Sequence, residues 1–233
     1  MLKNLLIWPL LPLSALQGLW LKKAATRLPG APGERNGAIG QGESLQLLAI
    51  GDSIIDGVGT ESMNHALPAL FARALSDRHG RRVHWQAEGK SGLAIDGLLH
   101  RLDSLDAIPP DVILISIGVN DVTGLIGAGQ WRERVDRLLN RIQVTWPTAQ
   151  TVFAGLPPMA MFPLLPQPLR MTLGWRASKL DGIAAAACAG MIAVHHIPTK
   201  IDPRLHSFSD DGYHPSSASC TVWAEELADS VSL

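Results

Sequence analysis

Residues 45–54 have the sequence LQLLAIGDSI, an apolar run that ends in Gly-Asp-Ser. A short, nearly continuous apolar run that stops at a turn is typical of a β-strand buried on both faces, as in a parallel sheet. The turn residues Gly51, Asp52 and Ser53 follow this strand at its carboxyl end. We therefore expect Ser53 at the edge of a sheet where α/β proteins bind their ligands.

The same alternation of apolar runs and helical patterns continues to the end of the chain. The apolar runs predict five strands, at 45–51, 83–87, 111–118, 151–156 and 191–197. The 3.6-residue periodicity predicts helices at 64–79, 93–105, 130–145, 176–189 and from Pro215 to about residue 231. Strands that alternate with helices in this way predict a single three-layer α/β/α domain with a five-stranded, doubly wound parallel sheet.

The composition is that of a globular protein, with 46% hydrophobic and 18% charged residues, and 233 residues suffice for one α/β domain with a good core. The formal net charge is −1 and no dense Lys/Arg stripe is present, which argues against nucleic acid as a partner. Cys188 and Cys220 have no second cysteine at metal or redox spacing, although a disulfide between them stays open. The adjacent His195 and His196 would point to opposite faces of a strand, so no metal site is expected.

The N-terminal part of the chain differs in composition from the rest. Residues 5–21 are mostly apolar, and residues 28–44 are rich in glycine and proline. We expect residues 1–44 to form an apolar arm and a linker, with the catalytic domain at 45–233, and the arm to pack on the domain or rest on a membrane surface. Most of the positive charge follows the apolar stretch, which opposes export and predicts a cytoplasmic location. A membrane span and a cleaved signal stay open as alternatives.

Several residues in the predicted turns have side chains suited to acyl transfer. The hydroxyl of Ser53 needs a base, and His214 is the best candidate because its ordinary pKa of roughly 6.5 suits proton transfer at neutral pH. Asp211 precedes His214 by three residues and can fold back onto one ring nitrogen while the other faces the serine. The Asn120 side chain and the backbone amides of Ser53 and Gly92 are candidate donors to a developing oxyanion.

These motifs resemble the conserved blocks of the SGNH subgroup of the GDSL hydrolases. The resemblance covers roughly residues 45–233, with Gly-Asp-Ser at 51–53, Gly-Val-Asn-Asp at 118–121 and Asp-Gly-Tyr-His-Pro at 211–215. It implies a flavodoxin-like SGNH fold and a hydrolase that works without a metal or other cofactor. The serine lies outside a Gly-x-Ser-x-Gly elbow, so the chain does not resemble an α/β-hydrolase.

The second block of this family is the least well matched. Gly92 fits its glycine, but the asparagine that often precedes it is replaced by Ala87. Gly89 is therefore a competing choice for the backbone donor of the oxyanion hole.

An apolar segment with five prolines, residues 156–170, follows the fourth predicted strand and should overhang the active-site edge. We interpret it as an acyl-binding wall or lid, with a simple connection over a helix end as the alternative. The side chains expected to bind substrate are Met159, Met161, Phe162, Leu164 and Leu165.

Together these features predict a serine esterase that hydrolyses carboxylic esters with short to medium acyl chains. Carbohydrate deacetylase, lysophospholipase, thioesterase and acyltransferase activities use the same residues and stay open. A flavodoxin-like binding module without catalysis is the alternative from a different class. The expected partner is a small-molecule ester, and the sequence specifies neither the physiological ester nor the oligomeric state.

Overall fold

The computed structural model of the chain describes residues 11–24, 28–105, 107–201 and 207–233. Its centre is a six-stranded sheet with the order β1-β3-β2-β4-β5-β6. The strands are β1 (Asn36–Ile39), β2 (Ser44–Gly51), β3 (Arg82–Gly89), β4 (Val112–Ser116), β5 (Gln150–Ala154) and β6 (Val194–Ile197). All neighbouring pairs are parallel except β1 and β3, which are antiparallel.

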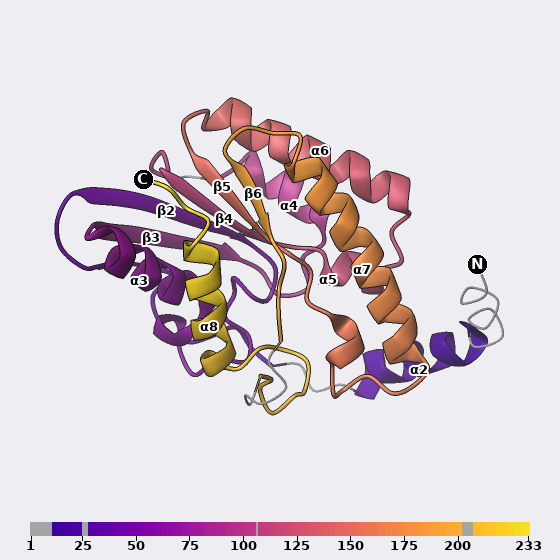
Figure 1. The fold of residues 1–233 in the computed structure, drawn as a ribbon. Helices are drawn as coiled ribbons and strands as arrows, with labels where there is room; N and C mark the ends of the chain where they lie inside the picture. Colours follow the sequence, from indigo (N-terminus) through magenta and orange to yellow (C-terminus); the bar gives the residue numbers. More distant parts are fainter. Residues whose placement is uncertain (1–10, 25–27, 106, 202–206) are drawn as a thin grey trace.

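Helices cover both faces of this sheet (Figure 1). One face is covered by α3 (Leu67–His79) and α8 (Ser217–Ala228), and the other by α4 (Ile95–Leu102), α6 (Ala128–Thr145) and α7 (Leu169–Cys188). Three short helices lie in the connections, namely η2 (Met63–His65), α5 (Val119–Thr123) and η3 (Met159–Met161). A further helix, α2 (Leu11–Ala24), lies against the N-terminal end of α7.

The central strands are buried on both faces because they contribute to two separate hydrophobic cores. In β2, Leu45, Leu47 and Ala49 belong to the core under α3 and α8, whereas Leu48 and Ile50 belong to the core under α4, α6 and α7. This explains the nearly continuous apolar run, since a strand with two covered faces has no solvent-facing position. The predicted three-layer α/β/α fold is confirmed.

The predicted strand count is wrong by one. Residues 36–39 lie within the segment expected to be a linker, but they form β1, which pairs with β3 from Asn36↔Gln86 to Ile39↔Val83. The sheet is therefore mixed rather than purely parallel. The strand was missed because it is short, lies at the edge of the sheet and has no apolar alternation of its own.

Several helix boundaries also differ from the prediction by two or more residues. The helix expected at 176–189 begins earlier, at Leu169, within the proline-rich segment. Pro215 forms a β-bridge with Phe208 instead of opening the last helix, and α8 begins at Ser217 with Ser216 as its N-cap. The Ser216 side chain accepts a hydrogen bond from Ser219 N at 3.2 Å, which satisfies one of the amide groups at the helix start.

The N-terminal arm is described from Leu11, and the expected contact of residues 5–10 lies outside the described residues. Helix α2 packs on the domain, where Gln17 Nε2 donates to Gln167 O at 2.7 Å. Among the helices of the described ranges, none has both the length and the apolar character needed to cross a bilayer.

Candidate active site

Ser53 lies in a tight turn that directly follows β2. The turn is fixed at its base because Asp52 N donates to Ser116 O of the neighbouring strand β4 at 3.0 Å. Asp56 N then donates back to Asp52 O at 3.0 Å, and Val58 N donates to Ser53 O at 2.9 Å. These backbone bonds place Ser53 at the carboxyl edge of the sheet.

A second turn, from Phe208 to Pro215, presents Asp211 and His214. Its ends are joined by the β-bridge between Phe208 and Pro215, and Ser209 N donates to His214 O at 2.9 Å. Asp211 Oδ1 accepts three hydrogen bonds, from Ser209 Oγ at 2.9 Å, Tyr213 N at 2.8 Å and His214 N at 2.9 Å. The carboxylate thus organises the turn that carries the imidazole.

The two turns meet at the imidazole of His214. His214 Nδ1 lies 2.6 Å from Asp211 Oδ2, and His214 Nε2 lies 3.1 Å from Ser53 Oγ. Because a carboxylate can only accept, Nδ1 carries the proton and Nε2 is left to accept the hydroxyl proton of Ser53. The structure therefore brings together the three residues that were predicted to form the catalytic group.

The environment keeps Asp211 ionised. Burial alone would raise the pKa of this carboxyl, but the hydrogen bonds from the His214 ring and from the backbone amides of His214 and Tyr213 outweigh it, so the pKa lies below its ordinary value. An ionised Asp211 can hold His214 in one tautomer and stabilise the ring when it is protonated.

Gly59 allows the two turns to approach each other. A Cβ atom at this position would lie 2.8 Å from His214 Cβ and 2.9 Å from Ser209 Oγ, and the residue has φ +92°. A larger residue here would be strained in its backbone and would push the second turn away from Ser53. Gly59 is thus the contact point between the nucleophile turn and the acid–base turn.

The residues predicted to hold an oxyanion lie on two further loops. Asn120, in the first turn of α5, donates from Nδ2 to Leu93 O at 2.9 Å, which orients the amide and leaves its second N–H for a ligand. Gly92 has φ +80° and open space around it, and its N–H makes no hydrogen bond to any described residue. Gly89 is required for a different reason, since a Cβ there would lie 2.2 Å from Asp56 N. Of the two competing glycines, the open space at Gly92 favours its amide as the donor, whereas Gly89 packs closely against the backbone of Asp56.

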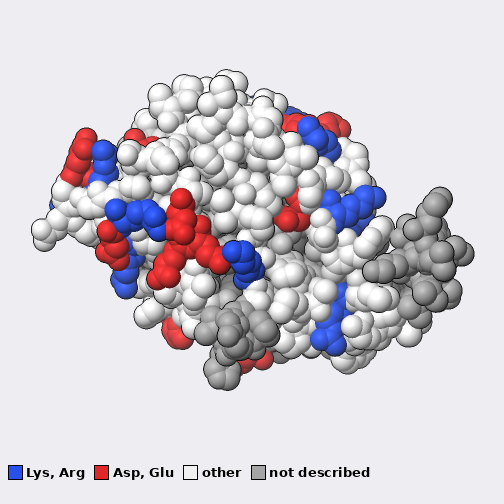
Figure 2. Space-filling view, viewed as in Figure 1, with Lys and Arg blue, Asp and Glu red and all other residues white. Residues whose placement is uncertain are grey.

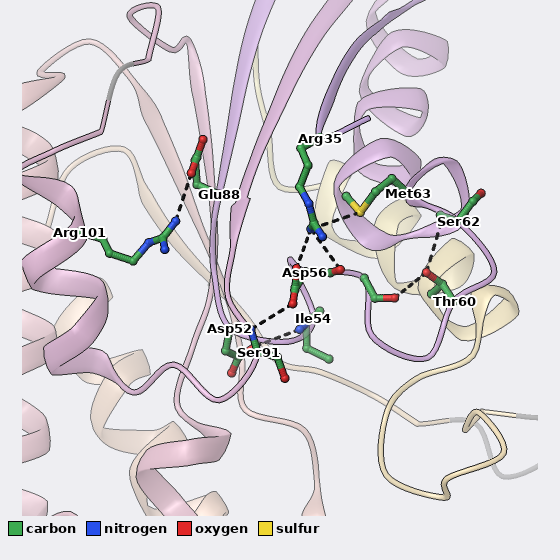
Figure 3. A network of polar contacts seen from close by, with 11 residues as sticks. Arg35, Asp52, Ile54, Asp56, Thr60, Ser62, Met63, Glu88, Ser91 and Arg101 are labelled. Carbon is green, nitrogen blue, oxygen red and sulfur yellow. Dashed lines mark hydrogen bonds and ion pairs between the residues drawn. The ribbon is translucent and has the colours of Figure 1, made fainter. Parts of the chain in front are cut away.

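An ion pair from outside the predicted site supports the loop that carries Gly92 (Figure 3). Asp56 Oδ2 accepts from Ser91 N at 3.1 Å, and Asp56 Oδ1 lies 2.7 Å from Arg35 Nη1. Arg35 Nη1 also donates to Asp56 O at 3.2 Å. Arg35 directly precedes β1, so the segment interpreted from sequence as a linker helps to position the loop at residues 90–92.

Two further carboxyl groups are buried beneath the site. Burial, with a smaller contribution from the negative charge of Asp121, raises the pKa of Asp52 to about 7. Burial also raises the pKa of Asp121 to about 6, although its carboxylate accepts from Ile95 N at 3.1 Å and 3.2 Å. Asp52 accepts one bond from Ile54 N at 3.1 Å, which only partly offsets its loss of hydration.

A small pocket of about 40 Å³ opens beside Ser53 and His214. Its lining is mostly apolar and comes from several elements, with Ile54, Val119, Pro157, Phe162, Ile201, Phe208, Tyr213 and Trp223. The expected acyl wall is therefore largely wrong, because only Phe162 of the five predicted side chains lines this pocket.

The other four predicted side chains lie elsewhere. Met159 and Leu165 are fully buried in the core under α7, where they fill space between the connection and the helix. Met161 is 38% exposed on the surface, and Leu164 N donates to Gly212 O at 3.1 Å, so this part of the segment supports the acid–base turn. An apolar loop without periodicity did not reveal which of its side chains face inward.

Known proteins place this arrangement in a family. The family model described as "GDSL-like Lipase/Acylhydrolase family" matches residues 49–219. The chain belongs to this GDSL family. A GDSL-like esterase from Mycobacterium tuberculosis is 28% identical to this GDSL-family protein over 194 residues, which cover 78% of the present chain and 60% of the relative. The chain thus spans less than two thirds of that relative's length.

Solved structures show the same fold at low sequence identity. A lipase from a goat rumen metagenome has a TM-score of 0.67 and 20% identity, with 79% of this GDSL-family chain and 96% of the lipase covered. A family 3 carbohydrate esterase from Clostridium thermocellum has a TM-score of 0.64 and 18% identity, and the match covers 80% of this GDSL-family chain and 94% of the esterase.

The Asp56 ion pair predicts a loss of turnover that leaves substrate binding nearly intact. Asp56→Asn removes the charge that holds Arg35 and weakens the anchor of Ser91, so kcat for ester hydrolysis should fall about tenfold with little change in KM. Arg35→Lys should retain more activity than Arg35→Ala. Steady-state kinetics on a chromogenic ester would measure both. Arg132→Ala is the matched control, because its ion pair with Asp136 is exposed on α6 and far from the loop, and wild-type kcat in Asp56→Asn would contradict the prediction.

The raised pKa of Asp52 predicts that this group costs stability as the pH increases. The folded protein keeps the proton up to about pH 7, whereas the unfolded chain releases it near the ordinary pKa of 3.8, so stability falls between these values. Asp52→Asn removes this dependence, so its gain in unfolding free energy relative to wild type should be larger at pH 8 than at pH 5, by up to roughly 3 kcal/mol, and its melting temperature should follow. Thermal melts at both pH values test this.

Asp77→Asn, which changes an exposed carboxylate on α3, is the control for that experiment. An equal shift of melting temperature with pH in Asp52→Asn and in wild type would show that the buried carboxyl does not carry the effect.

Proposed function

We propose that this GDSL-family protein is a serine esterase that hydrolyses carboxylic esters with short acyl chains through an acyl-enzyme intermediate. The observation that carries the proposal is the unbroken hydrogen-bonded path from Ser53 through His214 to Asp211. A serine hydroxyl becomes a nucleophile at neutral pH when a base accepts its proton and a third group holds that base. A non-catalytic binding module, the alternative from a different class, does not require this path.

In the first step Ser53 Oγ attacks the ester carbonyl and its proton passes to His214 Nε2. The imidazolium that forms keeps its Nδ1 hydrogen bond to Asp211, whose negative charge stabilises it. The carbonyl oxygen becomes an oxyanion as the new C–O bond forms. The backbone amides of Ser53 and Gly92 and the second N–H of Asn120 are the donors available to it, and each well-placed donor contributes about 3 kcal/mol.

The second half of the reaction uses the same groups in reverse. His214 gives its proton to the departing alcohol, and the acyl group stays on Ser53 Oγ. A water molecule then loses a proton to His214 Nε2 and attacks the acyl carbon, which releases the carboxylic acid and restores the serine hydroxyl. Acceptance of a second alcohol in place of water would make the enzyme an acyltransferase.

The pocket argues for a short acyl group. The cavity beside Ser53 has a volume of only about 40 Å³. Phe162 packs edge to face on two aromatic rings of the pocket lining, with its ring centre 5.3 Å from that of Phe208 and 5.0 Å from that of Tyr213. Because both partners belong to the acid–base turn, that turn fixes this side of the pocket. An acetyl or propionyl group suits such a pocket better than a long alkyl chain.

The names of the structural neighbours keep two related substrates open. One neighbour is a carbohydrate esterase and another is a lipase, and both chemistries would use the same triad. A panel of p-nitrophenyl esters of increasing acyl length, an acetylated saccharide, a lysophospholipid and an acyl-thioester separates them. We expect kcat/KM to be highest for the acetyl or propionyl ester, and a preference for long chains would contradict the short-acyl assignment.

Replacement of the nucleophile gives the direct kinetic prediction. Ser53→Ala should lower kcat for p-nitrophenyl acetate by at least about 10⁴-fold, because the acyl-enzyme cannot form. The melting temperature should stay close to that of wild type. Ser104→Ala is the matched control, since Ser104 follows α4 and its Oγ donates to Arg101 O, away from the site. Near wild-type turnover in Ser53→Ala would remove this residue from the mechanism and favour the non-catalytic alternative.

A further inference from the structure

Helix α2 is attached to the domain by its polar side. Ser14 is only 4% exposed, and its Oγ lies 3.3 Å from Thr172 Oγ1 of α7. Gln17 makes two bonds to the start of α7, donating to Gln167 O at 2.7 Å and accepting from Leu169 N at 3.1 Å. The hydrogen-bonding side chains of this helix therefore face the protein.

Four apolar side chains of the same helix face outward, whereas Leu21 packs against the core under α4, α6 and α7. Leu13, Leu16, Leu19 and Trp20 are 48%, 65%, 64% and 63% exposed. Positions 13, 16 and 20 follow the i, i+3, i+7 spacing of one helix face, so these side chains form a stripe. A surface helix in water has the opposite arrangement, with its apolar stripe against the core. The reversed orientation of α2 suits an apolar surrounding.

Helix α7, to which α2 is bonded, also has exposed apolar side chains near this contact. Met171 and Trp175 of α7 are 41% and 51% exposed and lie on either side of Thr172 in sequence. Lys179 Nζ lies 5.7 Å from the centre of the Trp175 ring, so a positive charge borders the surface. We call the six side chains Leu13, Leu16, Leu19, Trp20, Met171 and Trp175 the α2–α7 apolar face.

All charged side chains in the N-terminal 27 residues are positive. Residues 1–27 contain Lys3, Lys22, Lys23 and Arg27 and no Asp or Glu, although the whole chain has a formal net charge of −1. Where α2 lies in the view of Figure 2, the surface is uncharged or positive, and no Asp or Glu is visible there. An apolar face that has Lys179 at its border, and whose α2 residues come from a part of the sequence in which all charged residues are basic, is complementary to a membrane with anionic headgroups.

We propose that the α2–α7 apolar face docks this protein on the surface of a bilayer that contains anionic phospholipid. Helix α2 would lie in the plane of the interface, with Leu13, Leu16, Leu19 and Trp20 among the upper acyl chains and with Ser14 and Gln17 held by α7. Tryptophan favours this depth because one edge of its ring is apolar and the other donates a hydrogen bond. The proposal is independent of the catalytic role of Ser53.

A second copy of the chain is a poorer occupant for this face. A stable protein–protein interface uses roughly 20–30 residues on each side. The α2–α7 apolar face offers six exposed apolar side chains, mostly from one helix, which is enough to enter a bilayer interface but small for a dimer.

Docking would also bring the active site near the membrane. Helix α2 bonds to Gln167, near the end of the connection between β5 and α7, and to Leu169, the first residue of α7. Phe162 of that connection lines the pocket beside Ser53. An ester at the membrane surface would then have a short path to the nucleophile.

The test is sedimentation of the full-length protein with vesicles of phosphatidylcholine, with or without phosphatidylglycerol. Wild type should bind vesicles that contain phosphatidylglycerol, and more weakly those without it. Leu16→Glu/Trp20→Glu should lower the partition coefficient by at least about tenfold, because two charges would have to enter the interface. Leu13→Ser/Leu19→Ser is a second variant with no added charge and should also weaken binding.

Val144→Glu/Ile192→Glu is the matched control, because these side chains are 81% and 85% exposed but lie away from α2. Its vesicle binding should equal that of wild type, and melting temperatures should show that every variant is folded. Three results would overturn the proposal: no binding of wild type, equal binding of wild type and Leu16→Glu/Trp20→Glu, or a dimer in light scattering that these substitutions dissociate. Equal binding to both kinds of vesicle would overturn the anionic requirement.

Discussion

The carboxylate of Asp211 is the constraint on which the site depends. One of its oxygens accepts from Ser209 Oγ and from the backbone amides of Tyr213 and His214, and the other faces His214 Nδ1 at 2.6 Å. The same group therefore shapes the turn, selects the tautomer and fixes the ring plane. Because its pKa is held below the ordinary value, it stays charged while the imidazole gains and loses a proton.

The sheet supplies the other half of the arrangement. Gly51 of β2 pairs with Ser116 of β4, so the turn with Ser53 and the helix start with Asn120 leave the sheet at the same level. The loop with Gly92 follows β3 on the other side of β2. Three strand ends thus fix the nucleophile and the candidate oxyanion donors, and the acid–base turn has only to reach across to them. Because neighbouring strand ends and one returning turn meet at the same edge of the sheet, residues that are distant in sequence can form one site.

Local sequence was sufficient to predict these strand ends. A buried strand followed by turn residues has a recognisable pattern, and Ser53 and Asn120 closely follow such strands. The Asp211–His214 pair follows no buried strand and was predicted from its three-residue spacing instead. The contact between Arg35 and Asp56 had no such signal, because an ion pair between distant segments leaves no periodicity in either of them.

The sequence also did not show which side chains of the two apolar segments, residues 156–170 and α2, face the protein. The burial of Met159 depends on how α7 packs over the connection, and a proline-rich loop has no repeat from which its inward side can be deduced. For α2, composition indicated an apolar arm, but only the packing against α7 shows that its polar side faces the protein. Strand β1 was missed because its pairing with β3, rather than its own sequence, stabilises it.

Labelling with a fluorophosphonate followed by peptide mass spectrometry tests the central claim most directly, because the probe bonds only to an activated nucleophile. The account predicts a single adduct on Ser53 in the wild-type protein, and labelling slower by roughly 10³-fold or more in Asp211→Asn. An adduct on a different residue, or equal labelling rates in Asp211→Asn and wild type, would contradict it.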